Sequence, residues 1–384
     1  MIKIGIRKNL IYPLMLIITT SIRKIDSILM IKINNFEASL FLTFIMFFGE
    51  FVFGIIIYLS NLLFLTKNKK SKENASRNSS LLGIKLIQRK SKLKIPDKKY
   101  KIYFIIFMTT FFDFNVFLLQ TYYLPGFYKF VYVTLIIRLR STLTICSAFL
   151  CYFLLKMPIY RHHIFSLIII IICLIIIIFT EYIYERIIYL YSALLFNFFV
   201  YFFNSCLDVS EKYLLEYNYI NPFKLLMLEG IIGLILVSIF SIWVNPLKEI
   251  KEVFDGEESI FKLYLLIIFL IIYFLSSGGR NIYRIITNKL YSPMTRTLTD
   301  CILDPLLLFF YFFFEEDFKS EGEQNILFFI INIIASFIIV FSSCVYNELF
   351  VLFCCNLEYN TYYQISRRST IYETLPNEST NNNV

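Results

Sequence analysis

Charged side chains occur inside several long apolar segments of this 384-residue chain. A charge at the centre of a bilayer costs about 2.5–3.5 kcal/mol on insertion scales, so it usually faces a cavity, an ion pathway or an opposite charge. Arginines there could hold an anionic group of a solute, and carboxylates could carry a coupled proton or balance the arginines. Salt bridges that only lock helices together are the alternative, and both interpretations stay open. The candidate residues for substrate binding or coupling are Glu50, Asp113, Arg138, Arg140, Glu229, Arg280, Arg296 and Asp300.

Residue patterns for enzymatic catalysis are absent from the sequence. The only two histidines, His162 and His163, are adjacent, and there is no Gly-rich phosphate-binding loop and no Gly-x-Ser-x-Gly pattern. None of the eight cysteines belongs to a Cys-x-x-Cys pair, so the sequence predicts neither a disulfide framework nor a zinc site. We therefore expect a protein that is not an enzyme, with no catalytic residues, no cofactor and no bound metal.

The elements that carry the charged residues are apolar stretches of helical length. Apolar residues make up 58% of the chain and charged residues 17%, whereas a soluble domain has about 45–50% and about 25%. A spanning helix needs about 20 mostly apolar residues. The stretch 9–22 follows a basic start but lacks a small-residue cleavage site, so we expect it to be retained as a first helix. Nine further spans are predicted at 41–65, 102–120, 131–155, 163–183, 187–207, 223–244, 261–278, 298–314 and 326–353.

Lysine and arginine are concentrated on one side of this ten-helix arrangement. With the amino terminus in the cytosol, they gather in the cytosolic segments, above all in the loop 66–101, whereas the outside loops 249–258 and 315–323 are acidic. This is the bias that the positive-inside rule describes. We expect both termini in the cytosol, with the loop 66–101 and the tail 356–384 disordered. The net charge of +9 then belongs to the cytosolic face and does not indicate a nucleic-acid partner.

Two short patterns recur five helices apart. Glu50 follows a glycine in the second predicted helix, and Glu229 precedes a glycine in the seventh. Arg140 begins the sequence Arg-Ser-Thr-Leu-Thr in the fourth helix, and Arg296 begins Arg-Thr-Leu-Thr at the start of the ninth. Because five is an odd number of crossings, the second copy enters the bilayer from the opposite side, as in the inverted repeats of many secondary transporters. The two predicted repeats are 1–183 and 187–355.

The segment 208–233 resembles the cytosolic loop and seventh helix of the F branch of solute carrier family 35, in the drug/metabolite transporter superfamily. The stretch Met46–Phe51 is similar to the second helix of that family, and Arg140 falls where the family has an arginine in its fourth helix. The chain departs from the family in its longer basic loop and its few glycines. The resemblance implies an all-α integral membrane fold with ten transmembrane helices in two inverted five-helix repeats.

The resemblance also implies a carrier that works by alternating access without ATP hydrolysis. Its substrate would be a small polar solute, such as a nucleotide sugar or another anion. The protein would lie in the lipid bilayer of an endomembrane, lysosome-like or Golgi. A homodimer is one assembly that stays open. The alternative function is a non-transporting membrane scaffold or interaction protein that retains the fold.

Two features near the carboxyl end could govern localisation. Tyr372 and Leu375 form a Tyr-x-x-Leu pattern of the kind that sorting adaptors read on the cytosolic side. Cys354 and Cys355 follow the tenth predicted helix at its cytosolic end, where S-palmitoylation is conceivable.

Overall fold

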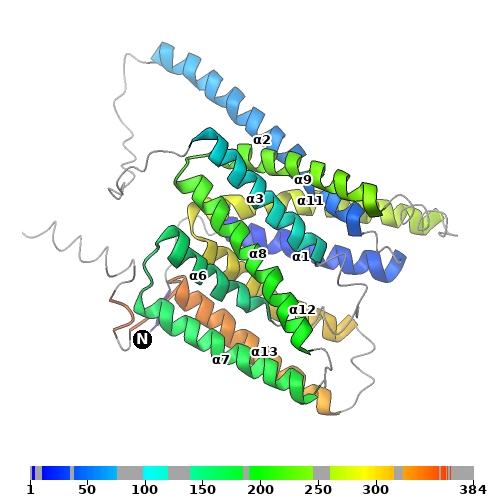
Figure 1. The fold of residues 1–384 in the computed structure, drawn as a ribbon, viewed down its shortest axis with the longest axis vertical. Coiled ribbons are helices and arrows are strands. Elements are labelled where there is room, and N and C mark those ends of the chain that lie inside the picture. The colour runs from blue at the N-terminus through cyan, green and yellow to red at the C-terminus, as the bar shows by residue number, and fades with distance from the viewer. Residues whose placement is uncertain are drawn as a thin grey trace, which may run out of the picture. The chain divides into compact units, whose positions relative to one another are not determined.

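Long α-helices make up almost all of the described chain in the computed structural model (Figure 1). The structure describes residues 2–4, 11–34, 39–75, 98–119, 139–184, 190–244, 260–314, 323–353, 356–359, 361 and 364. Among these residues the helices are α1 (Ile11–Asn34), α2 (Ser39–Ala75), α3 (Lys99–Leu118), the 3-10 turn η2 (Leu139–Ser141), α6 (Thr142–Leu155), α7 (Arg161–Tyr184), α8 (Leu190–Glu216), α9 (Pro222–Val244), α11 (Ile260–Leu290), α12 (Pro293–Phe314) and α13 (Glu323–Tyr346). Two short strands, β1 (Ile2–Ile4) and β2 (Phe350–Leu352), complete the fold.

Five of the described helices are long and apolar enough to cross a membrane. In α7, Ile172, Ile175 and Phe179 are each at least 51% exposed, whereas Ile170 and Ile177 are fully buried. A helix that turns large apolar side chains outward over its length suits a lipid surrounding rather than water. The all-α prediction is therefore confirmed, and the apolar helices indicate a membrane protein. The five spans are Leu40–Leu63, Lys99–Leu118, Arg161–Thr180, Pro222–Ile242 and Phe261–Leu290.

Several helices continue past the stretches that hydropathy predicted. α8 was expected to end at 207 and ends at Glu216, and α11 was expected to end at 278 and ends at Leu290. α2 reaches Ala75, inside the segment expected to be a disordered loop, and α1 is also longer than its predicted stretch. The added turns of α8 and α11 carry buried polar side chains. A hydropathy count assigns such residues to loops, although the helical backbone hydrogen bonds continue through them.

Packing divides the chain into two compact units, and each draws on both halves of the sequence. The first, which we call the six-helix unit, consists of Ile11–Val133 and Phe198–Arg296 and contains α1, α2, α3, most of α8, α9 and α11 among the described residues. The second, the four-helix unit, consists of Met1–Leu10, Thr134–Asn197 and Thr297–Val384 and contains α6, α7, most of α12 and α13. The sequential repeats predicted above stay a prediction.

The six-helix unit is built on two pairs of packed helices, α2 with α9 and α1 with α11 (Figure 1). Met46 and Phe47 of α2 pack with Phe114 and Phe117 of α3 and with Val237 of α9 in one buried cluster. A second buried cluster joins α3, α8, α9 and α11. These apolar layers lie on the same helices as the buried polar side chains and fix where those side chains can reach.

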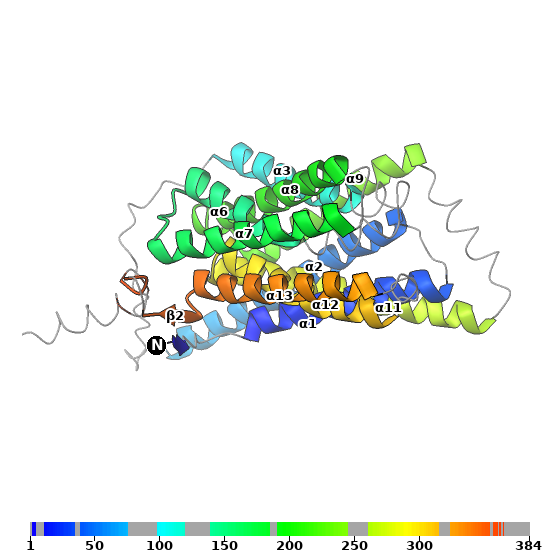
Figure 2. The same cartoon turned by 90° about the horizontal axis from the view of Figure 1, so that it is seen from below.

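The four-helix unit is organised around α7 and α13, which pack along one another (Figure 2). Just beyond α13, strand β2 pairs antiparallel with β1, and Ile2 lies opposite Leu352. The amino-terminal strand and the segment that follows the last long helix therefore lie side by side.

Candidate functional site

Helices α2 and α9 cross at a very short distance in the six-helix unit. A Cβ atom on Gly230 of α9 would lie 2.5 Å from the backbone nitrogen of Phe51, and one on Gly54 of α2 would lie 2.7 Å from that of Met227. Only glycine allows two backbones to approach this closely. Gly54 follows Phe51 in α2, whereas its neighbour Met227 precedes Gly230 in α9, so the two helices run antiparallel. This crossing sets the positions of the polar side chains beside it.

Glu50 and Glu229 lie next to this crossing and are 0% and 2% exposed. Asn281 of α11 donates from Nδ2 to Glu50 Oε1 at 2.5 Å, and Arg280 donates from Nη1 to Asn281 Oδ1 at 3.0 Å. Within the described part of the chain, Glu50 Oε2 and Glu229 Oε1 have no hydrogen-bond partner. Leaving a buried polar atom unsatisfied costs about 1–3 kcal/mol. A proton on either oxygen would remove the charge that makes this burial costly.

Arg284 of α11 is the centre of the buried polar site. Its side chain is 0% exposed, and its Nη2 lies 2.7 Å from Glu211 Oε1, 3.5 Å from Glu229 Oε2 and 3.9 Å from Glu50 Oε1. Its Nη1 donates to Asp113 Oδ2 at 3.0 Å. The four carboxylates come from α2, α3, α8 and α9, so one side chain of α11 links five helices. We call Arg284 and these four carboxylates the Arg284 cluster.

The Arg284 cluster contains more acidic than basic groups. Four carboxylates surround one guanidinium, and Arg280 adds a second positive charge one turn earlier on α11. Full ionisation would leave uncompensated negative charge in a low-dielectric interior, which costs several kcal/mol. Protonation of a carboxylate relieves this imbalance. The arrangement can therefore take up and release protons without exposing a charge to lipid.

Two further buried cations hold the surroundings of the cluster in place. Arg296, at the start of α12, pairs with Asp208 of α8 and donates from Nη2 to Asn204 Oδ1 at 3.2 Å. Lys212 donates from Nζ to the backbone oxygens of Asn288 at 2.9 Å and Tyr291 at 2.7 Å, at the end of α11. It therefore satisfies carbonyl groups that the helix itself leaves without partners. Lys212 also forms an ion pair with Glu216 at 2.7 Å. We assign these contacts a structural role, since they hold both cations against protein atoms.

The structure brings together three of the residues that the sequence selected, Glu50, Asp113 and Glu229. Arg280 lies one turn from Arg284 on the same helix, and Arg296 belongs to the separate pair with Asp208. Arg140 is buried in η2, and Asp300 is half-buried in α12 within the four-helix unit. Outside the described residues lie Arg138, Cys354, Cys355, Tyr372 and Leu375.

Sequence reasoning missed the residue at the centre, Arg284, because it lies between the predicted spans 261–278 and 298–314. It also missed Glu211, because it lies between the predicted spans 187–207 and 223–244. A signal was present: four polar residues of α11 recur at the spacing of one helix face, and all four are fully buried. These residues are Ser277, Asn281, Arg284 and Asn288.

Comparison with models of known protein families gives no match, and comparison with curated proteins gives none either. The fold and the site define an all-α membrane protein with a fully buried, acid-rich polar cluster among apolar helices.

Proposed function

We propose that this chain is a secondary transporter of the drug/metabolite type, which moves a polar organic solute by alternating access and couples that movement to protons at the Arg284 cluster. The observation that carries the proposal is the position of four carboxylates around one arginine, buried among the helices of the six-helix unit. Ionisable residues at membrane depth mark solute paths and proton relays because their burial is costly. The resemblance to the F branch of solute carrier family 35 points in the same direction.

The geometry of the α2–α9 crossing supports two inverted five-helix repeats. When Glu50 is aligned with Glu229, Phe51 falls on Gly230 and Gly54 falls on Gly233. Phe51 and Gly230 are themselves in contact at the crossing. Residues that are equivalent in two copies meet in this way where a pseudo-twofold axis passes between the copies.

Part of the pairing of helices is consistent with the same symmetry. In a five-plus-five arrangement the equivalent pairs are α1 with α8, α2 with α9, α3 with α11, α6 with α12, and α7 with α13. The packing of α2 against α11 then has its counterpart in α9 against α3, and that of α2 against α3 in α9 against α11. The extensive packing of α1 against α11 has no counterpart of similar extent among the described residues of α8 and α3, where the rings of Phe112 and Phe203 lie 5.8 Å apart. Both compact units consist of equivalent pairs.

Ten crossings would place both termini on one side of the membrane, which the charge bias predicts to be the cytosol. The pairing of β1 with β2 supports an even number of crossings, because it joins the amino-terminal strand to the segment after α13. The proposed location is an endomembrane, lysosome-like or Golgi. The proposed substrate is a small polar solute, with nucleotide sugars and other anions as the first class to examine.

The proposal is tested by transport in liposomes. The purified chain is reconstituted, and uptake of nucleotide sugars, amino acids and peptides is measured with and without an imposed pH gradient. We expect one class to enter in a gradient-dependent manner, and Glu229→Gln to abolish that dependence. Glu216→Gln is the control, since Glu216 is a 44% exposed acid outside the cluster whose ion pair, at 2.7 Å, is with Lys212. A rate of solute uptake that is the same with and without the pH gradient would refute coupling at the cluster. Absence of uptake for every solute would favour the scaffold function.

A further inference from the structure

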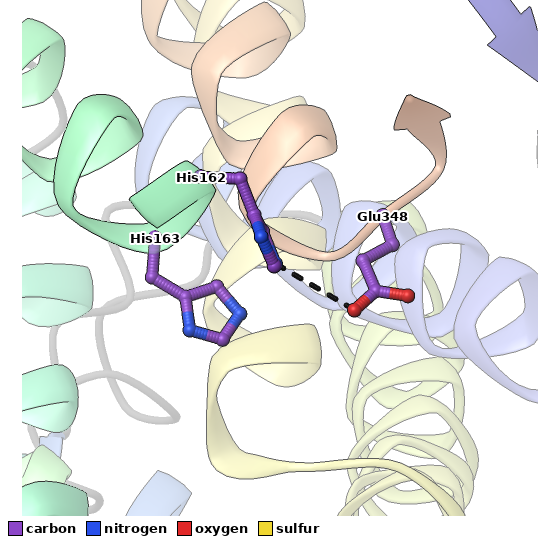
Figure 3. Close-up of side chains that lie close together, drawn as sticks. All are labelled: His162, His163 and Glu348. Carbon is purple, nitrogen blue, oxygen red and sulfur yellow. Dashed lines mark ion pairs between the residues drawn. The ribbon is translucent and has the colours of Figure 1, made fainter. Parts of the chain in front are cut away.

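Two adjacent histidines and a glutamate converge at one end of the four-helix unit. His162 and His163 lie in the first turn of α7, and Glu348 lies just after α13, the helix that packs along α7 (Figure 3). One ligand atom from each of the three side chains lies within 4.8 Å of the other two. His162 Nε2 lies 3.6 Å from Glu348 Oε1. That separation is too long for a hydrogen bond.

His162 is buried without the partners that a buried imidazole needs. It is 2% exposed, and neither of its ring nitrogens has a hydrogen-bond partner among the residues that the structure describes. A buried polar group left in this state costs about 1–3 kcal/mol. Such a group is expected where an ion or a water molecule binds. Nε2 of His162, the nitrogen that faces Glu348, is the atom that would bind a cation.

Glu348 occupies a backbone position that usually belongs to glycine. Its φ angle is +58°, and the hydrogen bonds Leu349 N to Cys344 O at 2.9 Å and Glu348 N to Val345 O at 3.1 Å close a Schellman motif at the end of α13. Glycine is strongly preferred at this left-handed position, because other residues meet a steric penalty there. The carboxylate of Glu348 faces His162. A functional contact of this carboxylate would explain why a glutamate occupies the left-handed position.

His163 is held beside the pair by two other contacts. The backbone N–H of Tyr160 donates to its Nδ1 at 3.2 Å, and its ring stacks on Tyr346 with centroids 4.4 Å apart. Nε2 is therefore the nitrogen available to a ligand. Binding through Nε2 would move the ring proton to Nδ1 and open the bond from Tyr160. His163 should accordingly be a weaker ligand than His162.

We propose that His162, His163 and Glu348 bind one divalent transition-metal ion of the zinc class. Two imidazoles and one carboxylate are a known zinc ligand set that leaves a fourth position for water. With zinc–nitrogen distances of about 2.0–2.1 Å, tetrahedral ligand atoms lie about 3.4 Å apart, so small side-chain rotations close the site from its present distances. Imidazole ligands favour zinc and its neighbours over calcium and magnesium. The bound ion would link the start of α7 to the end of α13 through its ligands.

The site is tested by zinc binding to the full chain, purified without a histidine tag, stripped with a chelator and dialysed against zinc chloride. We expect one zinc per chain by mass spectrometry of the metal, a more than tenfold loss of affinity in His162→Asn and Glu348→Gln, and a smaller loss in His163→Gln. The variant Cys354→Ser/Cys355→Ser is the matched control, because adjacent thiols are the other soft ligands in this part of the sequence. Zinc binding that the thiol variant abolishes, or that the histidine and glutamate variants leave unchanged, would overturn the proposal.

A second measurement covers the case in which a variant does not fold. Because the chain has only two histidines, modification of histidine by diethyl pyrocarbonate in the unaltered protein reports on this site alone. We expect zinc to slow the modification at least tenfold relative to magnesium. Equal rates in the two metals would contradict the assignment, whatever the variants do. Neither test depends on transport activity, so the site can fail without affecting the proposed function.

Discussion

Replacement of Arg284 by methionine tests whether the buried cluster holds the six-helix unit together. Methionine keeps a long unbranched side chain but removes the guanidinium, so the ion pairs with Glu211 at 2.7 Å and with Asp113 at 3.0 Å are lost. Removing one partner of a buried ion pair destabilises a protein by about 3–5 kcal/mol, because the remaining charge stays buried without compensation. We expect Arg284→Met to lower the free energy of unfolding by about that amount.

A double-mutant cycle separates this effect from a loss of packing. Glu211→Gln keeps the shape of the side chain and should cost about 1–3 kcal/mol on its own. In the double variant the carboxylate closest to the missing guanidinium no longer carries a charge. The destabilisation of the double variant should therefore be smaller than the sum of the two single destabilisations, by about 0.5–3 kcal/mol. Glu216→Gln on the same helix is the control, since it removes only a partly exposed i,i+4 ion pair with Lys212 and should change stability by about 0.5 kcal/mol or less.

The assay is equilibrium unfolding in mixed micelles, with sodium dodecyl sulfate as the denaturant and helical circular dichroism as the signal. If Arg284→Met unfolds at the same denaturant fraction as the unaltered protein, the cluster does not stabilise the fold. If the costs of the two substitutions are additive, Arg284 and Glu211 do not interact as the 2.7 Å contact requires.

Three other substitutions have clear expected outcomes. Gly230→Ala should destabilise the chain by about 1–3 kcal/mol through overpacking at the α2–α9 crossing, whereas Gly49→Ala, whose nearest neighbour would be 3.4 Å away, should cost much less in the same unfolding assay. Lys212→Met should increase hydrogen exchange at the end of α11, because the carbonyl groups there lose their donor; unchanged exchange would show that water replaces it fully. Glu348→Gly should stabilise the metal-free chain by about 1 kcal/mol, since it relieves the left-handed backbone, and should at the same time abolish zinc binding; a loss of stability would argue against that strain.

The apolar helices were predictable because a run of apolar residues is nearly sufficient to specify a membrane span. The stretch predicted at 223–244 and the observed helix Pro222–Val244 agree to one residue. The ends of α8 and α11 were not predictable in this way, because their last turns carry buried polar residues. Hydropathy measures preference for lipid, and these turns face protein.

The candidate site was predictable only in part, and for the same reason. Glu50 and Glu229 stand out because each is a lone charge beside glycine in an apolar run. Arg284 and Glu211 lie beyond the ends of the predicted apolar spans, in segments with more polar residues. Only their helical spacing distinguishes them from loop residues. The role proposed for Glu348 depends on a helix end that no sequence pattern marks, since the left-handed position is occupied by a residue other than glycine.

Proton movement driven by solute is the most direct test of the central claim, the coupling of transport to the Arg284 cluster. Liposomes that contain the chain and an internal pH-sensitive dye are exposed to a solute that they take up, with no pH gradient imposed. We predict that the solute changes the internal pH with the unaltered protein and with Glu216→Gln, and that Glu50→Gln and Glu229→Gln abolish the change. Proton movement that persists in both cluster variants, or solute uptake without any change in internal pH, would contradict the account.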